Sequence, residues 1–99
     1  MRAIIDEVQK SDMGTGCGHY DFSPNTTLKN ALDYLKNNLK AWGTITIYRG
    51  NTIVRLFDYE LFNNSIFYHH LAGWEYNKKV KAIDFRYCFM NEDIYIYIE

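Results

Sequence analysis

Large apolar side chains in the first half of the chain recur at the spacing of an amphipathic helix. Five of them follow one another at intervals of four, three, four and three residues: Leu28, Leu32, Leu35, Leu39 and Trp42. This spacing places all five on one stripe of a helix, with polar residues on the other side. We therefore predict a helix over residues 26–42 whose apolar side packs on a sheet.

Residues that favour helix ends flank this segment. Ser23, or one of Asn25–Thr27, can cap the free amide groups at the start, and Pro24 suits the first turn. Gly43 follows the last apolar position, where helices often end in a left-handed residue.

Alternating apolar and polar residues after the helix predict a β-hairpin in "TITIYRGNTIVRLFDYEL". Gly50 and Asn51 supply the positive φ angles of a tight turn. Folding about that turn predicts four cross-strand pairs: Ile45–Leu56, Thr46–Arg55, Ile47–Val54 and Tyr48–Ile53. One face of this hairpin is then aliphatic, and the other mixes polar groups with aromatic rings.

A second hairpin is predicted in "VKAIDFRYCFMNEDIYIYIE", with a loop centred on Asn91–Glu92. Its expected pairs are Phe85–Ile98, Tyr87–Ile96 and Phe89–Ile94. The reverse face is then expected to carry four other side chains: Arg86, Cys88, Tyr95 and Tyr97.

Three segments are less sharply patterned. Residues 2–9 fit a helix or a strand, and their β-branched residues favour the strand. Residues 14–18, "GTGCG", read as a turn. "LFNNSIFYHHL" reads as a turn at Asn63–Asn64 followed by a strand, with a helix over residues 58–72 as the alternative.

These elements predict one α+β domain covering residues 1–99. One amphipathic helix packs on a curled antiparallel sheet of four to five strands, in the order β-α-β-β-β-β, as two layers. The strands after the helix are expected to form a meander. In this order of elements the chain resembles cystatin-like folds, but no inhibitory loop motif of that family is present, so the resemblance implies nothing about function.

Composition narrows the function classes. The 99 residues hold 11 basic and 12 acidic side chains, a net charge of -1, so no strong field favours nucleic acid or an anionic membrane. No apolar run approaches the roughly 20 residues that span a bilayer, and the first residues lack the apolar core of a signal peptide. We expect a cytoplasmic protein with two free thiols. The abundance of Asn, Lys, Ile, Tyr and Phe is typical of AT-rich genomes, including those of phages.

The glycine-rich stretch raises the question of phosphate binding or nucleophilic chemistry. It lacks the Lys-Ser/Thr ending of a phosphate loop, and seven residues separate Gly18 from the earliest helix position, so a phosphate reading fails. Cys17 and His19 share a face if this stretch is a strand, which would allow thiol chemistry assisted by the imidazole. The alternative is a plain turn with a half-buried cysteine.

Zinc binding is the second chemical alternative. Five side chains supply suitable donors: Cys17, His19, His69, His70 and Cys88. Their spacing matches no short zinc motif, and adjacent histidines on a strand point to opposite faces. No cofactor is therefore expected.

The favoured functional hypothesis rests on the sheet face away from the helix. Tyrosine and arginine are enriched at protein interfaces, because each offers a broad contact area with a polar tip. Five such residues are expected on that face: Tyr48, Arg55, Arg86, Tyr95 and Tyr97. We expect a non-catalytic domain that binds a protein partner or a second copy of itself. An accessory factor of a phage or mobile element that binds a host protein would fit this expectation. Nucleic acid binding is disfavoured, because only two arginines are expected on this face.

Overall fold

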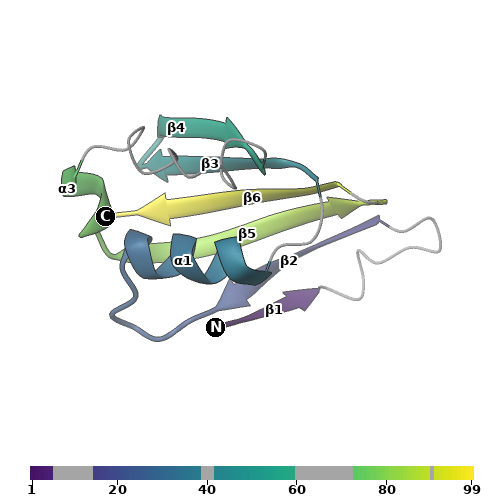
Figure 1. The fold of residues 1–99 in the computed structure, drawn as a ribbon, viewed down its shortest axis with the longest axis horizontal. Coiled ribbons are helices and arrows are strands. Elements are labelled where there is room, and N and C mark those ends of the chain that lie inside the picture. Colours follow the sequence, from purple (N-terminus) through teal and green to yellow (C-terminus); the bar gives the residue numbers. More distant parts are fainter. Residues whose placement is uncertain (6–14, 39–41, 60–72, 90) are drawn as a thin grey trace.

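A computed structural model describes residues 1–5, 15–38, 42–59, 73–89 and 91–99 (Figure 1). Within these ranges it contains α1 (Leu28–Asn38), a short helix α3 (Gly73–Tyr76), and six strands: β1 (Arg2–Ile5), β2 (Thr15–Asp21), β3 (Thr44–Arg49), β4 (Thr52–Asp58), β5 (Val80–Cys88) and β6 (Asn91–Ile98). The strands form one sheet in the order β1-β2-β5-β6-β3-β4. The expected α+β class, with a helix packed on a sheet, is confirmed.

The sheet differs from the expected one in size and direction. It is a mixed six-stranded sheet within the described residues, because β3 and β6 pair in parallel while the other neighbours are antiparallel. The expected antiparallel meander of four to five strands is therefore wrong. The glycine-rich stretch forms β2 instead of a turn, and β6 inserts between β5 and β3.

Thr27, directly before α1, caps the start of the helix. The Thr27 hydroxyl accepts a hydrogen bond from the Asn30 amide at 3.3 Å, and the Thr27 carbonyl accepts one from Ala31 at 3.0 Å. Pro24 lies in the turn before the cap, so its expected place in the first helical turn is wrong. At the other end, residues 39–41 fall outside the described ranges.

Trp42 and Gly43 differ from their expected roles at the end of the helix. The Trp42 side chain is 68% exposed instead of buried, and its residue forms a bridge to Asn91 of β6. Gly43 has a φ of 154°, and a Cβ there would stand 2.1 Å from the carbonyl oxygen of Glu92. Glycine is therefore required by the close approach of two backbones, and not by a helix C-terminus.

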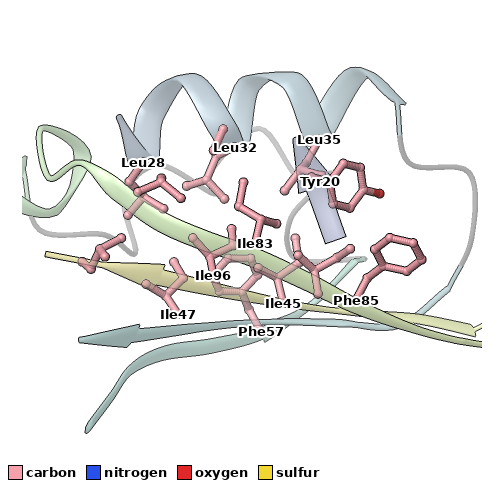
Figure 2. Packing of buried hydrophobic residues seen from close by; sticks show 14 of the residues in the cluster. Tyr20, Leu28, Leu32, Leu35, Ile45, Ile47, Phe57, Ile83, Phe85 and Ile96 are labelled. Atoms are coloured by element: carbon pink, nitrogen blue, oxygen red, sulfur yellow. The ribbon is translucent and has the colours of Figure 1, made fainter. Parts of the chain in front are cut away.

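The core lies between α1 and the sheet (Figure 2). Leu28, Leu32 and Leu35 are fully buried and point from the helix toward isoleucines of the central strands. Along β6, Ile94, Ile96 and Ile98 are buried while the tyrosines between them are half-buried. Full burial of each such side chain contributes about 1.5–3 kcal/mol, so this contact stabilises the two-layer arrangement.

The first hairpin turns at Gly50 and Asn51 as predicted, but of the two only Gly50 has a positive φ, 62°, and the register shifts beyond the turn. Tyr48 pairs with Ile53 as predicted, and a bulge between Ile47 and Tyr48 then moves every later pair by one residue. The observed pairs are Ile47–Arg55, Thr46–Leu56 and Ile45–Phe57. As a result Leu56 is 62% exposed and Phe57 only 7% exposed, the reverse of the expected faces.

The second hairpin also pairs differently from the prediction. Its turn lies between Cys88 and Asn91, two residues earlier than predicted, so Ile94 pairs with Phe85 and Ile96 with Ile83. An even shift leaves the faces unchanged. The segment predicted as a turn and strand at Asn63–Asn64, or as a helix over residues 58–72, lies largely outside the described residues, although β4 continues through Asp58.

Glu92 connects several elements at one end of the sheet. The Tyr20 hydroxyl donates to its carboxylate oxygen Oε1 at 2.7 Å, and the Tyr59 hydroxyl donates to its backbone carbonyl. Burial raises the pKa of both phenols above the ordinary value near 10, and the charge of Glu92 adds to both shifts. Both tyrosines are thus held neutral in the folded protein.

We expect the protein to lose stability in alkaline solution. A phenol whose pKa is raised by folding contributes stability below the unfolded-state pKa near 10, and that contribution is lost as the pH rises further. Tyr20 and Tyr59 together should lower the free energy of unfolding by about 2.7 kcal/mol per pH unit above that point. Urea unfolding at a series of alkaline pH values measures this slope; a stability independent of pH there would contradict the burial of both phenols.

Candidate binding surface

Helix α1 covers one face of the sheet, and the opposite face is here called the outer face (Figure 1). Residues of five strands lie in register on the outer face. Cross-strand pairing aligns them in three rows: Cys17, Arg86 and Asp93; His19, Asp84, Tyr95, Thr46 and Leu56; Tyr97, Tyr48 and Ile53. Directly opposite residues in neighbouring strands lie close enough to interact. The rows therefore place aromatic and aliphatic groups toward β4 and charged groups and a thiol toward β2.

A hollow of about 610 Å³ lies on this face and is called the outer groove. Seven side chains line it, with Gly18 and Phe85 also contributing: Cys17, His19, Tyr48, Asp84, Arg86, Tyr95 and Tyr97. Its volume falls within the range of ligand-binding clefts.

The aromatic part of the outer groove is built on β3 and β6. The rings of Tyr48 and Tyr97 stack, with centroids 5.1 Å apart and planes at 14°. Burial raises the pKa of the Tyr97 hydroxyl, and the nearby charge of Asp84 raises it further. Ile53 and Leu56 extend the apolar surface along β4, where they are 53% and 62% exposed.

The charged part of the outer groove is built on β5. Arg86 lies opposite Cys17 on one side and Asp93 on the other, while Asp84 lies opposite His19 and Tyr95. Neither Arg86 nor Asp84 forms an ion pair with another of the described residues.

The predicted thiol pair lies at the rim of this groove. Cys17 is half-buried, and the His19 ring nitrogen Nε2 lies 3.3 Å from the Asp21 carboxylate. Cys17, His19 and Asp21 alternate along β2 and so share one face. Cys88 is exposed and lines a second hollow of about 300 Å³ together with Cys17.

The predicted zinc donors are brought together only in part. Cys17, His19 and Cys88 lie on the outer face, while His69 and His70 fall outside the described residues. Within the part of the chain that the structure describes, no group of three or more His, Cys, Asp or Glu side chains is placed to hold a metal ion.

Arg55 does not join the other predicted surface residues. The bulge places it opposite buried Ile47, and its Nη2 lies 3.1 Å from Oε1 of Glu75 on α3. The Glu75 side chain is 2% exposed, and its second oxygen has no hydrogen-bond partner among the residues that the structure describes. Tyr48, Arg86, Tyr95 and Tyr97 do line one hollow, without Arg55.

Asp84 is the groove residue that sequence reasoning missed. It stands two residues before Arg86 on the same strand, so strand alternation alone places it on the same face. The predicted surface contained only tyrosine and arginine, the residue types enriched at interfaces, and so did not include this carboxylate.

Comparisons with protein-family models, with curated proteins and with solved structures found no match to this chain. Among the described residues, no helix is long and apolar enough to cross a membrane.

Proposed function

We propose that this chain is a non-catalytic binding domain that recognises a protein partner with its outer groove. The observation that carries the proposal is the meeting of three tyrosines with Arg86 and Asp84 in one hollow on the face opposite the helix. Tyrosine and arginine dominate the energetics of protein interfaces. The exposed Ile53 and Leu56 beside the groove would enlarge the apolar contact area.

A protein partner is favoured over nucleic acid by the charges of this face. Asp84 and Asp93 stand beside Arg86, and the whole chain has a net charge of -1. A nucleic-acid surface needs a positive field to offset the phosphates. The composition suits a phage or mobile-element factor that binds a host protein, which is the form of this function that we propose.

Replacing Tyr95 and Tyr97 together by alanine should abolish partner binding. Each substitution removes a large ring from the groove, and truncating a tyrosine that acts as a hot spot costs about 2 kcal/mol or more. Capture of host proteins by the immobilised domain, followed by titration of the purified partner, measures the loss. Sedimentation of the free domain measures self-association.

The matched control replaces two exposed aromatic residues away from the groove. Trp42 and Phe89 are 68% and 58% exposed, and neither lines the hollow. The variant Trp42→Ala with Phe89→Ala should keep partner binding intact. Loss of binding in this control, with binding retained by the double tyrosine variant, would overturn the proposed surface.

Thiol chemistry at Cys17 is the second candidate function. It is favoured by the contact between His19 and Asp21, which gives the imidazole an orienting carboxylate. Cys17 and His19 alternate on the face of β2 that also carries this contact.

Labelling of the two cysteines with iodoacetamide tests this second candidate. If Cys17 has a chemical role, it should react faster than Cys88 although it is less exposed, and His19→Gln should abolish the difference. Equal rates in both proteins, with partner binding unchanged in Cys17→Ser, would reject thiol chemistry.

A further inference from the structure

We infer that the outer groove receives a basic side chain, a lysine or an arginine, from the protein partner. This inference rests on the proposed function, because it names the group of the partner that the groove recognises. It follows from the meeting of three features: a carboxylate that has no ion pair among the described residues, aromatic rings beside it, and a hollow of about 610 Å³ that has room for a side chain of the partner.

Asp84 forms no ion pair with another of the described residues, although Arg86 stands two residues along the same face of β5. Across the sheet its neighbours are His19 and Tyr95, and His19 already contacts Asp21 at 3.3 Å. An ammonium or guanidinium group placed beside Asp84 would supply the missing counter-charge, and hydrogen bonds between such charged groups are the strong ones.

The aromatic wall beside Asp84 suits the same cation. Tyr95 lies directly opposite Asp84, and the Asp84 charge reaches Tyr97 closely enough to raise the pKa of that hydroxyl. Tyr97 in turn stacks on Tyr48. Aromatic ring faces attract lysine and arginine, and the aliphatic stem of either side chain can pack along the rings.

Arg86 does not cancel this preference. It lies one cross-strand row away from Asp84 and pairs across the strands with Asp93, an acidic residue whose Oδ1 accepts hydrogen bonds from Thr44. Arg86 would repel a cation that entered at the end of the groove nearer the β5–β6 turn. The ring faces of Tyr95 and Tyr97 are therefore the favoured place for the cation.

The test uses blocked single residues as probes. N-acetyl-lysine methylamide and N-acetyl-arginine methylamide are titrated into the labelled protein and followed by NMR at the tyrosine rings and the carboxyl carbons. N-acetyl-norleucine methylamide, which has a similar stem without the charge, is the neutral control. We expect saturable shifts at Tyr95, Tyr97 and Asp84 with the two cations, and at least about tenfold weaker binding of norleucine.

Two carboxylate variants complete the test. Asp84→Asn should weaken binding of the cationic probes about fivefold to tenfold. Asp33→Asn, which removes a carboxylate from α1 on the other side of the sheet, should leave it unchanged. Equal binding of norleucine and lysine, shifts confined to other surfaces, no effect of Asp84→Asn, or no saturable shift at tens of millimolar probe would each overturn the inference.

The outcomes separate this inference from the proposed function. If Asp84→Asn keeps full partner binding while the double tyrosine variant loses it, the groove binds a protein but not through a basic side chain. If the cationic probes bind at Asp84 while the double tyrosine variant still captures the partner, the cation site stands and the proposed protein interface falls.

Discussion

Replacing Ile96 by alanine is expected to lower the free energy of unfolding by about 2–5 kcal/mol, the range for truncating a large core side chain. Ile96 lies on a central strand, is fully buried, and pairs with Ile83 of β5 and Ile47 of β3. The surrounding chain cannot close the resulting cavity without moving two neighbouring strands. Urea unfolding at neutral pH measures the loss.

Tyr97→Ala, one residue later on the same strand, is the matched control. Its side chain is half-buried on the outer face, so its removal leaves no enclosed cavity. The expected cost is about 1 kcal/mol, mainly the lost stacking on Tyr48. A larger loss for Tyr97→Ala than for Ile96→Ala would mean that the two faces of β6 have been assigned the wrong way round.

Arg55→Met is expected to cost about 3 kcal/mol of unfolding free energy, because it leaves a buried carboxylate without its cation. Oε1 of Glu75 lies 3.1 Å from Arg55 Nη2, and the Glu75 side chain is only 2% exposed. We take the lower end of the range for breaking a buried ion pair, since the Arg55 side chain is itself 37% exposed.

The double variant Arg55→Met with Glu75→Leu tests the cause of this loss. Replacing both partners of a buried ion pair by apolar groups is often neutral or stabilising. We therefore expect the double variant to recover most of the stability lost in Arg55→Met, as measured by the urea midpoint. An additive loss would show that packing of the arginine stem, and not the stranded charge, is responsible.

The leucine stripe and the alternation along β6 predicted the helix and the buried face of the sheet. Both signals are local, because they depend only on the spacing of neighbouring residues in a helix or strand. The prediction for β6 survived an error in hairpin register, since the turn moved by an even number of residues and left the faces of Ile94 and Tyr95 unchanged.

The strand pairings that could not be predicted from the sequence depend on contacts between distant segments. Nothing near Gly16 or Gly18 indicates that β5 lies beside them, and that pairing makes the glycine-rich stretch a strand. The parallel pairing of β3 with β6 is equally invisible in the order of the hairpins. The bulge at Ile47 moved Arg55 away from the outer face by a single residue, a change that periodicity cannot reveal.

The candidate site, like the fold, could be predicted only where it depends on local alternation. Tyr48, Arg86, Tyr95 and Tyr97 follow from alternation within each hairpin. They meet Cys17 and His19 only because β2 pairs with β5. The sequence therefore predicted two separate surfaces, whereas in the structure both sets of residues line one hollow.

The central place of β6 has a consequence for how the chain acquires its structure during synthesis. Within the described residues, β6 is the only strand that joins β1-β2-β5 to β3-β4, and it is translated after all of them. Until residues 91–98 have been made, β5 and β3 therefore lack the strand that lies between them in the folded sheet. Each of the two groups of strands then has an unpaired edge. Contacts between such distant segments slow folding, so newly made chains would present these edges to chaperones and to one another before the last strand closes the sheet.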